Sequence, residues 1–129
     1  MEPITPALRK GARLFNEEEF FEAHEVWEDE WHEAVGTNKT FLHGLIQTAA
    51  AYVHHKRGNP QGVLSLSNSA LIYLKKVPSY YRGVDVKHVR NINREAKERA
   101  ERSIKEEKEL VLRKYTIEVE ENKEEEQKK

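Results

Sequence analysis

The sequence predicts an all-α fold, an antiparallel helical bundle of about five helices whose last helix is long and highly charged. Charged residues make up 35% of the 129-residue chain, which has only 6 Gly and 4 Pro to interrupt long helices. Apolar residues also recur at three- and four-residue spacing in successive stretches, as in amphipathic helices. A chain of this length is large enough for one hydrophobic core and too short for two.

The five helices are expected at residues 3–15, 17–36, 40–57, 61–77 and 85–112. Asn16 is a good N-cap for the second helix, and Gly36 is a good residue to end it. Gly58, Asn59 and Pro60 separate the third helix from the fourth, and residues 78–83 are expected to form a loop. The fifth helix has a narrow apolar stripe between alternating charges, which predicts a thin packing seam or contact with another subunit.

The bundle domain is assigned to residues 1–114 and a charged C-terminal tail to residues 115–129. A short extended segment is expected where apolar residues alternate with polar ones, at Tyr115, Ile117 and Val119. Residues 120–129 are expected to be mobile in solution.

Composition excludes several classes of function. The net charge of −1 argues against a protein that coats nucleic acid or an anionic membrane. The absence of cysteine excludes disulfides and thiolate metal sites and favours a reducing cytoplasm. The N-terminus has no basic region followed by an apolar run, and the longest apolar-leaning stretch, residues 41–53, is too short to span a bilayer. A cytoplasmic protein without nucleic-acid or membrane partners is therefore expected.

The second helix contains the main functional clue, between residues 20 and 31. On a helical wheel, His24 and Glu28 fall in the middle of the apolar face, beside Trp27 and Trp31, which are expected to anchor the core. Isolated charge is costly to bury, so these two polar side chains indicate a site. Glu25 lies at the border of the face. The opposite face is acidic and expected to face solvent, with Glu18, Glu19, Glu22, Asp29, Glu30 and Glu33.

The third helix has polar residues on its small-residue face, where Gln47 and His54 lie close together on the wheel with His43. Two antiparallel helices joined by a short loop are neighbours in a bundle, and residues equally far from the loop face each other. This pairing predicts a cluster of His24, Glu28, Gln47 and His54, with His43 nearer the loop.

Three interpretations of this cluster remain open. It could bind a divalent metal such as Zn, Mn, Fe or Ni, because His24 and Glu28 at i, i+4 share one helical face and imidazole and carboxylate suit these ions. It could be a metal-free acid–base or small-molecule site. It could also be an internal hydrogen-bond network that fixes helix register. The second histidine of His-Glu-x-x-His and the paired Glu-x-x-His motifs of di-iron bundles are missing.

Residues 16–28, NEEEFFEAHEVWE, followed by Trp31, resemble the signature of the domain of unknown function 309 family. The similarity continues through residues 41–47, 49–51, 54 and 57–59, with a weaker echo at 83–85. The family comprises small all-helical proteins of bacteria and archaea, some of them labelled predicted metal-dependent hydrolases. Its characteristic polar positions fall here on Glu22, His24, Glu25, Glu28, Gln47 and His54. His43 departs from the pattern, and we leave it out of the site.

The resemblance favours a metal-dependent hydrolase-like site that takes a small polar ligand. His24, Glu28 and His54 would be the metal ligands. Glu25 would support them or act as general base, and Gln47 would orient water or substrate. The competing hypothesis is a non-catalytic interaction or scaffold module, in which the cluster is structural and the fifth helix mediates contact with a partner or a second copy of the chain.

Overall fold

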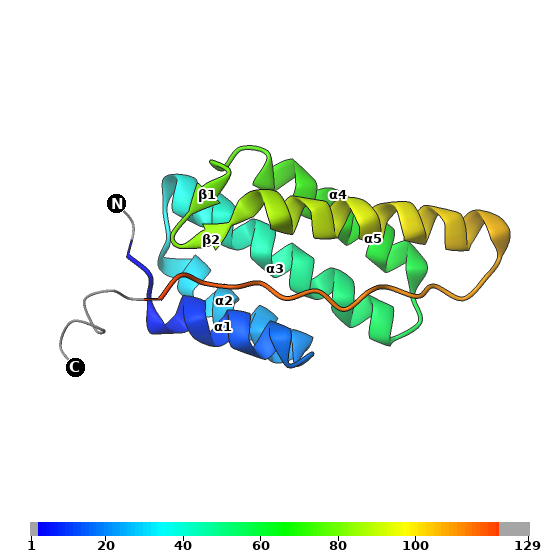
Figure 1. The fold of residues 1–129 in the computed structure, drawn as a ribbon, viewed down its shortest axis with the longest axis horizontal. Helices are drawn as coiled ribbons and strands as arrows, with labels where there is room; N and C mark the ends of the chain where they lie inside the picture. The colour runs from blue at the N-terminus through cyan, green and yellow to red at the C-terminus, as the bar shows by residue number, and fades with distance from the viewer. Residues whose placement is uncertain (1–2, 122–129) are drawn as a thin grey trace.

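The computed structural model describes residues 3–121 and confirms the all-α prediction (Figure 1). Each helix packs against the next one along the chain, so the second and third helices lie side by side. The elements are α1 (Pro6–Asn16), α2 (Phe20–Glu33), α3 (Gly36–Lys56), α4 (Pro60–Leu74), β1 (Tyr80–Tyr81), β2 (Val84–Asp85) and α5 (Val86–Glu106). Within residues 3–121, none of the helices is both long and apolar enough to cross a membrane.

The boundaries of α2 differ from those expected. Asn16 is the last residue of α1, and its side chain bonds to Ile117 and not to the start of α2. Helix α2 begins at Phe20, after Glu18 has reversed the chain with a left-handed φ of 64°. Gly36, with φ of 60°, starts α3 and does not end α2. Gly36 therefore has the left-handed backbone that was expected of it, but it lies at the start of α3 and not at the end of α2.

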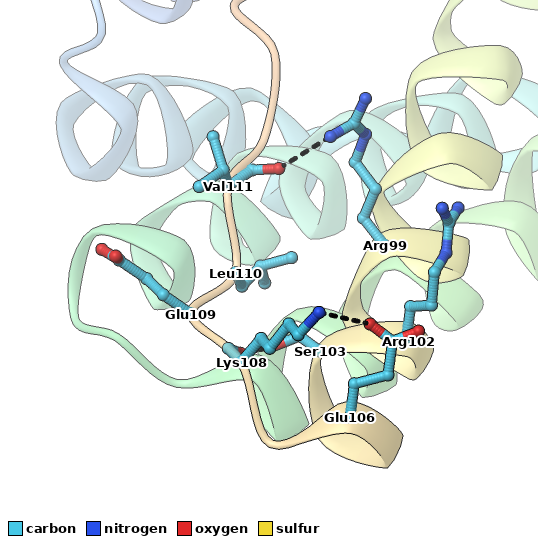
Figure 2. A pocket seen from close by; sticks show the side chains of 8 residues that line it. All are labelled: Arg99, Arg102, Ser103, Glu106, Lys108, Glu109, Leu110 and Val111. Atoms are coloured by element: carbon cyan, nitrogen blue, oxygen red, sulfur yellow. Dashed lines mark hydrogen bonds and ion pairs between the residues drawn. The ribbon is translucent and has the colours of Figure 1, made fainter.

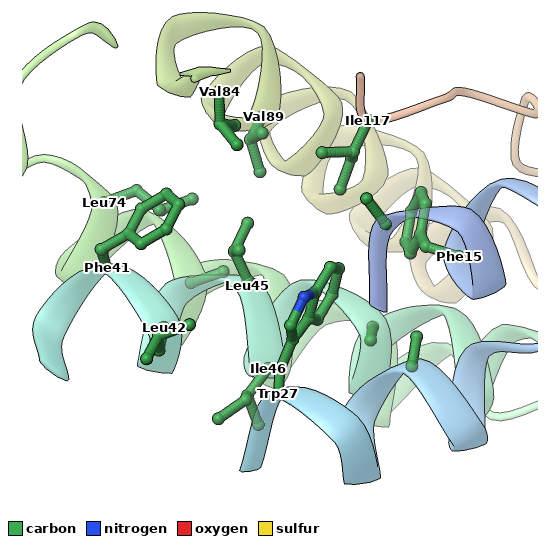
Figure 3. Packing of buried hydrophobic residues seen from close by; sticks show 14 of the residues in the cluster. Phe15, Trp27, Phe41, Leu42, Leu45, Ile46, Leu74, Val84, Val89 and Ile117 are labelled. Atoms are coloured by element: carbon green, nitrogen blue, oxygen red, sulfur yellow. The ribbon is translucent and has the colours of Figure 1, made fainter. Parts of the chain in front are cut away.

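The core forms where α1, α2 and α3 meet the hairpin and α5 (Figure 3). Trp27 is fully buried, as predicted, and its Nε1 donates to the backbone oxygen of Leu8 at 3.3 Å. Helix α1 comes this close because residue 11 is glycine, where a Cβ would lie 2.1 Å from that same Nε1. Trp31 is only partly buried and packs at the margin of the core.

A β-hairpin stands where the sequence predicts only a loop. Tyr81 pairs with Val84, which leaves a two-residue turn of Arg82 and Gly83 with φ of 49° and 75°. Two left-handed residues in succession give the turn whose twist matches a hairpin. Asn-Gly is the usual choice there, so an arginine in the first position needs a separate reason.

The chain after α5 forms an extended strap, defined here as residues 107–121. Glu107, with a left-handed φ of 54°, ends α5 six residues before the predicted end, and the strap then runs back along the bundle (Figure 1, orange to red). Ile117 is buried in the core, and Val119 forms a β-bridge with Val84. Residues 115–121 therefore pack against the bundle and do not form a separate tail, while residues 122–129 lie outside the described part.

Candidate functional site

His24 and Glu28 lie together on α2, as their spacing predicts, but both are partly exposed and so do not lie in the buried middle of its apolar face. His24 Nε2 is 3.6 Å from Glu28 Oε2, and the two side chains are 27% and 45% exposed. The other carboxylate oxygen of Glu28 is 4.0 Å from Nε2 of His32, one turn further along. His24 Nδ1 is buried and has no hydrogen-bond partner among the described residues. The imidazole thus has one nitrogen beside a carboxylate and one that is free to accept or donate.

His54 reaches the same place from α3. His24 and His54 line one small pocket of about 110 Å³, together with Phe21, Ala50, Val53 and Arg57. His54 Nδ1 is 3.0 Å from the side-chain nitrogen of Asn59, whose own oxygen caps α4 through the N–H of Gly62. Because Asn59 donates there, His54 Nδ1 accepts, and Nε2 carries the proton of the neutral ring.

The other two predicted residues lie elsewhere. Gln47 donates from Nε2 to the hydroxyl of Ser69 at 3.3 Å, which turns it toward α4. Glu25 is exposed on α2. Neither residue lines the pocket. The structure therefore brings His24 together with Glu28 and with His54, but it does not bring Gln47 or Glu25 to them.

The predicted metal ligands can be compared with what a metal centre requires. A metal site with three protein ligands needs the donor atoms about 2 Å from one point. Across residues 3–121, no three His, Cys, Asp or Glu side chains are grouped so that they could hold a metal ion. Glu28 lies outside the lining of the pocket, and His54 Nδ1 is already bonded. As placed, the trio of His24, Glu28 and His54 does not fit a preassembled metal centre.

An aromatic row joins α2, α3 and α4 through Trp31, His43 and Tyr73, none of which lines this pocket. The rings of His43 and Tyr73 stack with centroids 4.0 Å apart, and Trp31 lies 5.3 Å from His43 on the other side. Lys39 Nζ sits 4.5 Å above the Trp31 ring. Burial, with a contribution from the Lys39 charge, lowers the pKa of His43 below its usual 6.5. His43 is therefore part of a stacked row and not of the histidine pocket.

Sequence reasoning missed the most buried ion pair of the described chain, Arg82 with Glu30. The Arg82 guanidinium also donates to the backbone oxygen of Pro3 at 2.6 Å, to Asn38 at 2.9 Å and to Thr5 at 3.1 Å. These contacts join the hairpin to the N-terminal segment, α2 and α3. The available signal in the sequence was a cation in the first position of the left-handed turn. Such a turn disfavours arginine, so the residue indicates that its side chain makes stabilising contacts.

Comparisons with known proteins agree with the sequence resemblance. A family model described as "Domain of unknown function (DUF309)" matches residues 8–66, which include all of α2 and α3 and end within α4. A protein of Aquifex aeolicus (strain VF5), described as an uncharacterized protein, is 30% identical over 87 residues. That match covers 64% of this chain but only 25% of the Aquifex protein. Residues 8–66, which carry both histidines of the pocket, thus match the model of the family of domain of unknown function DUF309.

Proposed function

We propose that the pocket between α2 and α3 is the functional site, and that it carries out hydrolase-like acid–base chemistry on a small polar ligand. The observation behind the proposal is that His24 and His54, from different helices, line one pocket while Glu28 lies 3.6 Å from His24. An imidazole beside a carboxylate is a common general base, and the N–H of a second imidazole can stabilise the negative charge that develops during hydrolysis.

The proposed roles follow from the polar neighbours of the two rings. With Glu28 beside Nε2, His24 has Nδ1 as the nitrogen that accepts a proton from the attacking water. Phe21 stacks on the His24 ring and is half exposed, so rotation of Phe21 is the movement that opens Nδ1 to a ligand. His54, whose Nδ1 accepts from Asn59, has an Nε2–H that can donate a hydrogen bond to the oxygen on which negative charge develops. His24 then gives the proton that it took from water to the leaving group as the bond to that group breaks, so both rings end the cycle neutral.

Arg57 gives the pocket its preference for ligands. It lines the pocket at the end of α3, and its guanidinium forms no ion pair or hydrogen bond within residues 3–121. A free guanidinium favours carboxylate or phosphate oxygens. The walls from Phe21, Ala50 and Val53 are apolar, so the ligand would combine a compact anionic group with a small apolar part.

Metal-assisted hydrolysis through His24, Glu28 and His54 is the more specific form of this proposal that the family resemblance implies. Zn²⁺ or Mn²⁺ bound there would polarise the ligand and lower the pKa of a bound water. Because the described donors do not form a three-ligand group, none of the steps above depends on metal, and added metal is one arm of the test.

The test is an ester and phosphoester hydrolysis assay with nitrophenyl substrates, run with chelator and with added Zn²⁺ or Mn²⁺. His24→Gln and His54→Gln should each lower the rate by about 100-fold or more, the usual size of the contribution of a general base or of a hydrogen-bond donor to developing negative charge. His32→Gln, which changes an exposed histidine on the same helix outside the pocket, should leave the rate unchanged. Equal rates in all four proteins would contradict the proposal.

The competing proposal is a non-catalytic interaction module. It is favoured by the exposure of two apolar residues on and just after α2, Phe21 at 50% and Val35 at 79%. The strap already covers part of α5, through Arg99 to the Val111 oxygen and Tyr115 to Glu95, and this leaves less of α5 for contact with a second copy. If His24→Gln lowers the melting temperature and changes neither hydrolysis nor metal content, the polar residues are structural.

A further inference from the structure

We propose a second ligand site, for a small oxyanion that carries a hydrogen-bond donor, in the groove between α1 and the strap. The groove encloses about 310 Å³ between one face of α1 and residues 117–119. It shares no lining residue with the histidine pocket, so the two proposals stand or fall separately.

Two unpaired arginines carry the argument. Arg9 and Arg13 lie one helical turn apart and both line the groove. Neither side chain forms an ion pair or a hydrogen bond within residues 3–121, and Nη2 of Arg9 is buried without an acceptor. A buried N–H without a partner costs free energy, and like charges at i, i+4 repel each other. An anion in the groove would relieve both costs, because it supplies the missing acceptor and the opposite charge.

A second basic pocket shows what an arginine with internal partners looks like. At the far end of α5, Arg99 donates to the backbone oxygen of Val111 and Lys108 pairs with Glu106 (Figure 2). Arg99 also pairs with Glu95. Arg99 and Lys108 have protein acceptors there, and Arg102, which has none among residues 3–121, is exposed to solvent. In the α1 groove, by contrast, a guanidinium nitrogen is buried without an acceptor, namely Nη2 of Arg9. This contrast points to the α1 groove as the place for an external anion.

The carboxylates of the groove narrow the class of ligand. Glu17 and Glu118 also line it, and neither pairs with Arg9 or Arg13. An ionised carboxylate only accepts hydrogen bonds. It therefore repels an anion that carries no proton, but it can accept a hydrogen bond from an anion that does carry one. Inorganic phosphate keeps a proton near neutral pH, whereas sulfate does not. We therefore infer a preference for phosphate, or a similar protonated oxyanion, over sulfate.

The site is complete only when the strap is docked. Asn16 fixes the strap beside α1 by accepting from the Ile117 N–H at 2.7 Å and donating to the Ile117 oxygen at 3.1 Å. The strap lies outside residues 8–66, which match the family model, so this site depends on a part of the chain that the model does not cover. Anion binding should in turn hold the strap to α1, because a ligand stabilises the state that binds it.

The experiment is isothermal titration of the full chain with inorganic phosphate and with sulfate at matched ionic strength, in the wild type and in Arg9→Gln, Arg13→Gln and Lys10→Gln. Lys10 is an exposed cation on the same helix that does not line the groove, so its variant controls for net charge. We expect saturable phosphate binding that either arginine variant weakens at least about tenfold and Lys10→Gln less than about twofold. Sulfate should bind at least about tenfold more weakly, and Glu17→Gln should narrow that difference.

The result that overturns the site is an absence of saturable binding of either anion by the wild type, or an equal loss in Lys10→Gln. Equal affinity for the two anions overturns the assignment of Glu17 and Glu118 as acceptors. A second measurement covers the case of a variant that does not fold. Phosphate should raise the melting temperature of the wild type and also of Arg57→Gln, which removes the cation of the histidine pocket, and chloride at the same ionic strength should raise neither.

Discussion

The Arg82 guanidinium donates to both carboxylate oxygens of Glu30, from Nη1 to Oε2 at 3.0 Å and from Nη2 to Oε1 at 3.1 Å. The two residues are 52 positions apart, and their side chains are only 1% and 16% exposed. A bidentate pair of this kind combines charge with a fixed planar geometry. It also explains why arginine occupies the first position of the hairpin turn, where the side chain compensates for the left-handed backbone.

Arg82→Asn should lower the free energy of unfolding by about 3–5 kcal/mol, because it leaves the Glu30 carboxylate buried without its partner. Asparagine tolerates the left-handed turn, so the loss reports the side-chain bonds and not the backbone. Arg82→Lys keeps the positive charge but loses the two parallel N–H donors of the guanidinium. Its free energy of unfolding should lie between those of the wild type and Arg82→Asn. Urea unfolding curves measure all three proteins, and a loss below about 1 kcal/mol in Arg82→Asn would contradict the role of the pair.

Glu30 should make the protein sensitive to acid. Burial raises the pKa of Glu30, but hydrogen bonds from Arg82 and Thr5, together with the Arg82 charge, outweigh this and lower it below its usual 4.5. The stability that the ionised carboxylate contributes is therefore complete above pH 4.5 and is lost as the pH falls through the lowered value of the folded state. Unfolding free energies of the wild type should drop over that range. Glu30→Gln should flatten this part of the profile, whereas Glu33→Gln, at an exposed position on the same helix, should not.

His43 should respond to pH in the same direction at a higher pH. Its pKa is lowered by burial and by Lys39, so the unfolded chain binds the proton more readily than the folded one. Stability is thus complete above pH 6.5 and falls as the pH drops through the lowered pKa of the folded state. NMR titration of the His43 ring should give a midpoint below 6.5, and Lys39→Gln should raise it. A midpoint that stays unchanged in Lys39→Gln would show that the lysine charge does not act on the ring.

Ile117→Ala tests whether the strap belongs to the core. Removing a fully buried isoleucine should cost about 2–5 kcal/mol of unfolding free energy through lost burial and the cavity left behind. Val111→Ala, on the same strap but 62% exposed, should change stability by no more than about 0.5 kcal/mol. Similar effects in the two variants would mean that the strap does not hold residue 117 in the core.

Periodicity was sufficient to predict the helices and the burial of Trp27, because both depend on which face of a helix is apolar. It also placed His24 beside Glu28, whose contact is set by one turn of a single helix. Gln47 was assigned to the wrong neighbour because its face of α3 borders two helices, and Ser69 on α4 provides a hydrogen-bond partner.

Glu30 shows the limit of reasoning from one helix at a time. The wheel of α2 places it among solvated acids, and nothing local to α2 indicates that Arg82 will cover it. Ile117 is a similar case, since alternation predicted an extended segment there but not a place in the core. In both cases the partner lies far along the chain, and only the tertiary fold decides the burial.

The contact between Asn16 and Ile117 joins residues 101 positions apart, so it sets an order of events during synthesis. Helices α1 to α5 all leave the ribosome before the segment that seals the space between α1 and the hairpin. Until then, the apolar surface that Ile117 covers stays open to water and to other chains. Closing so long a loop is entropically costly and slow compared with helix formation. The nascent protein should therefore depend most on chaperones in the interval between the emergence of α5 and that of Ile117.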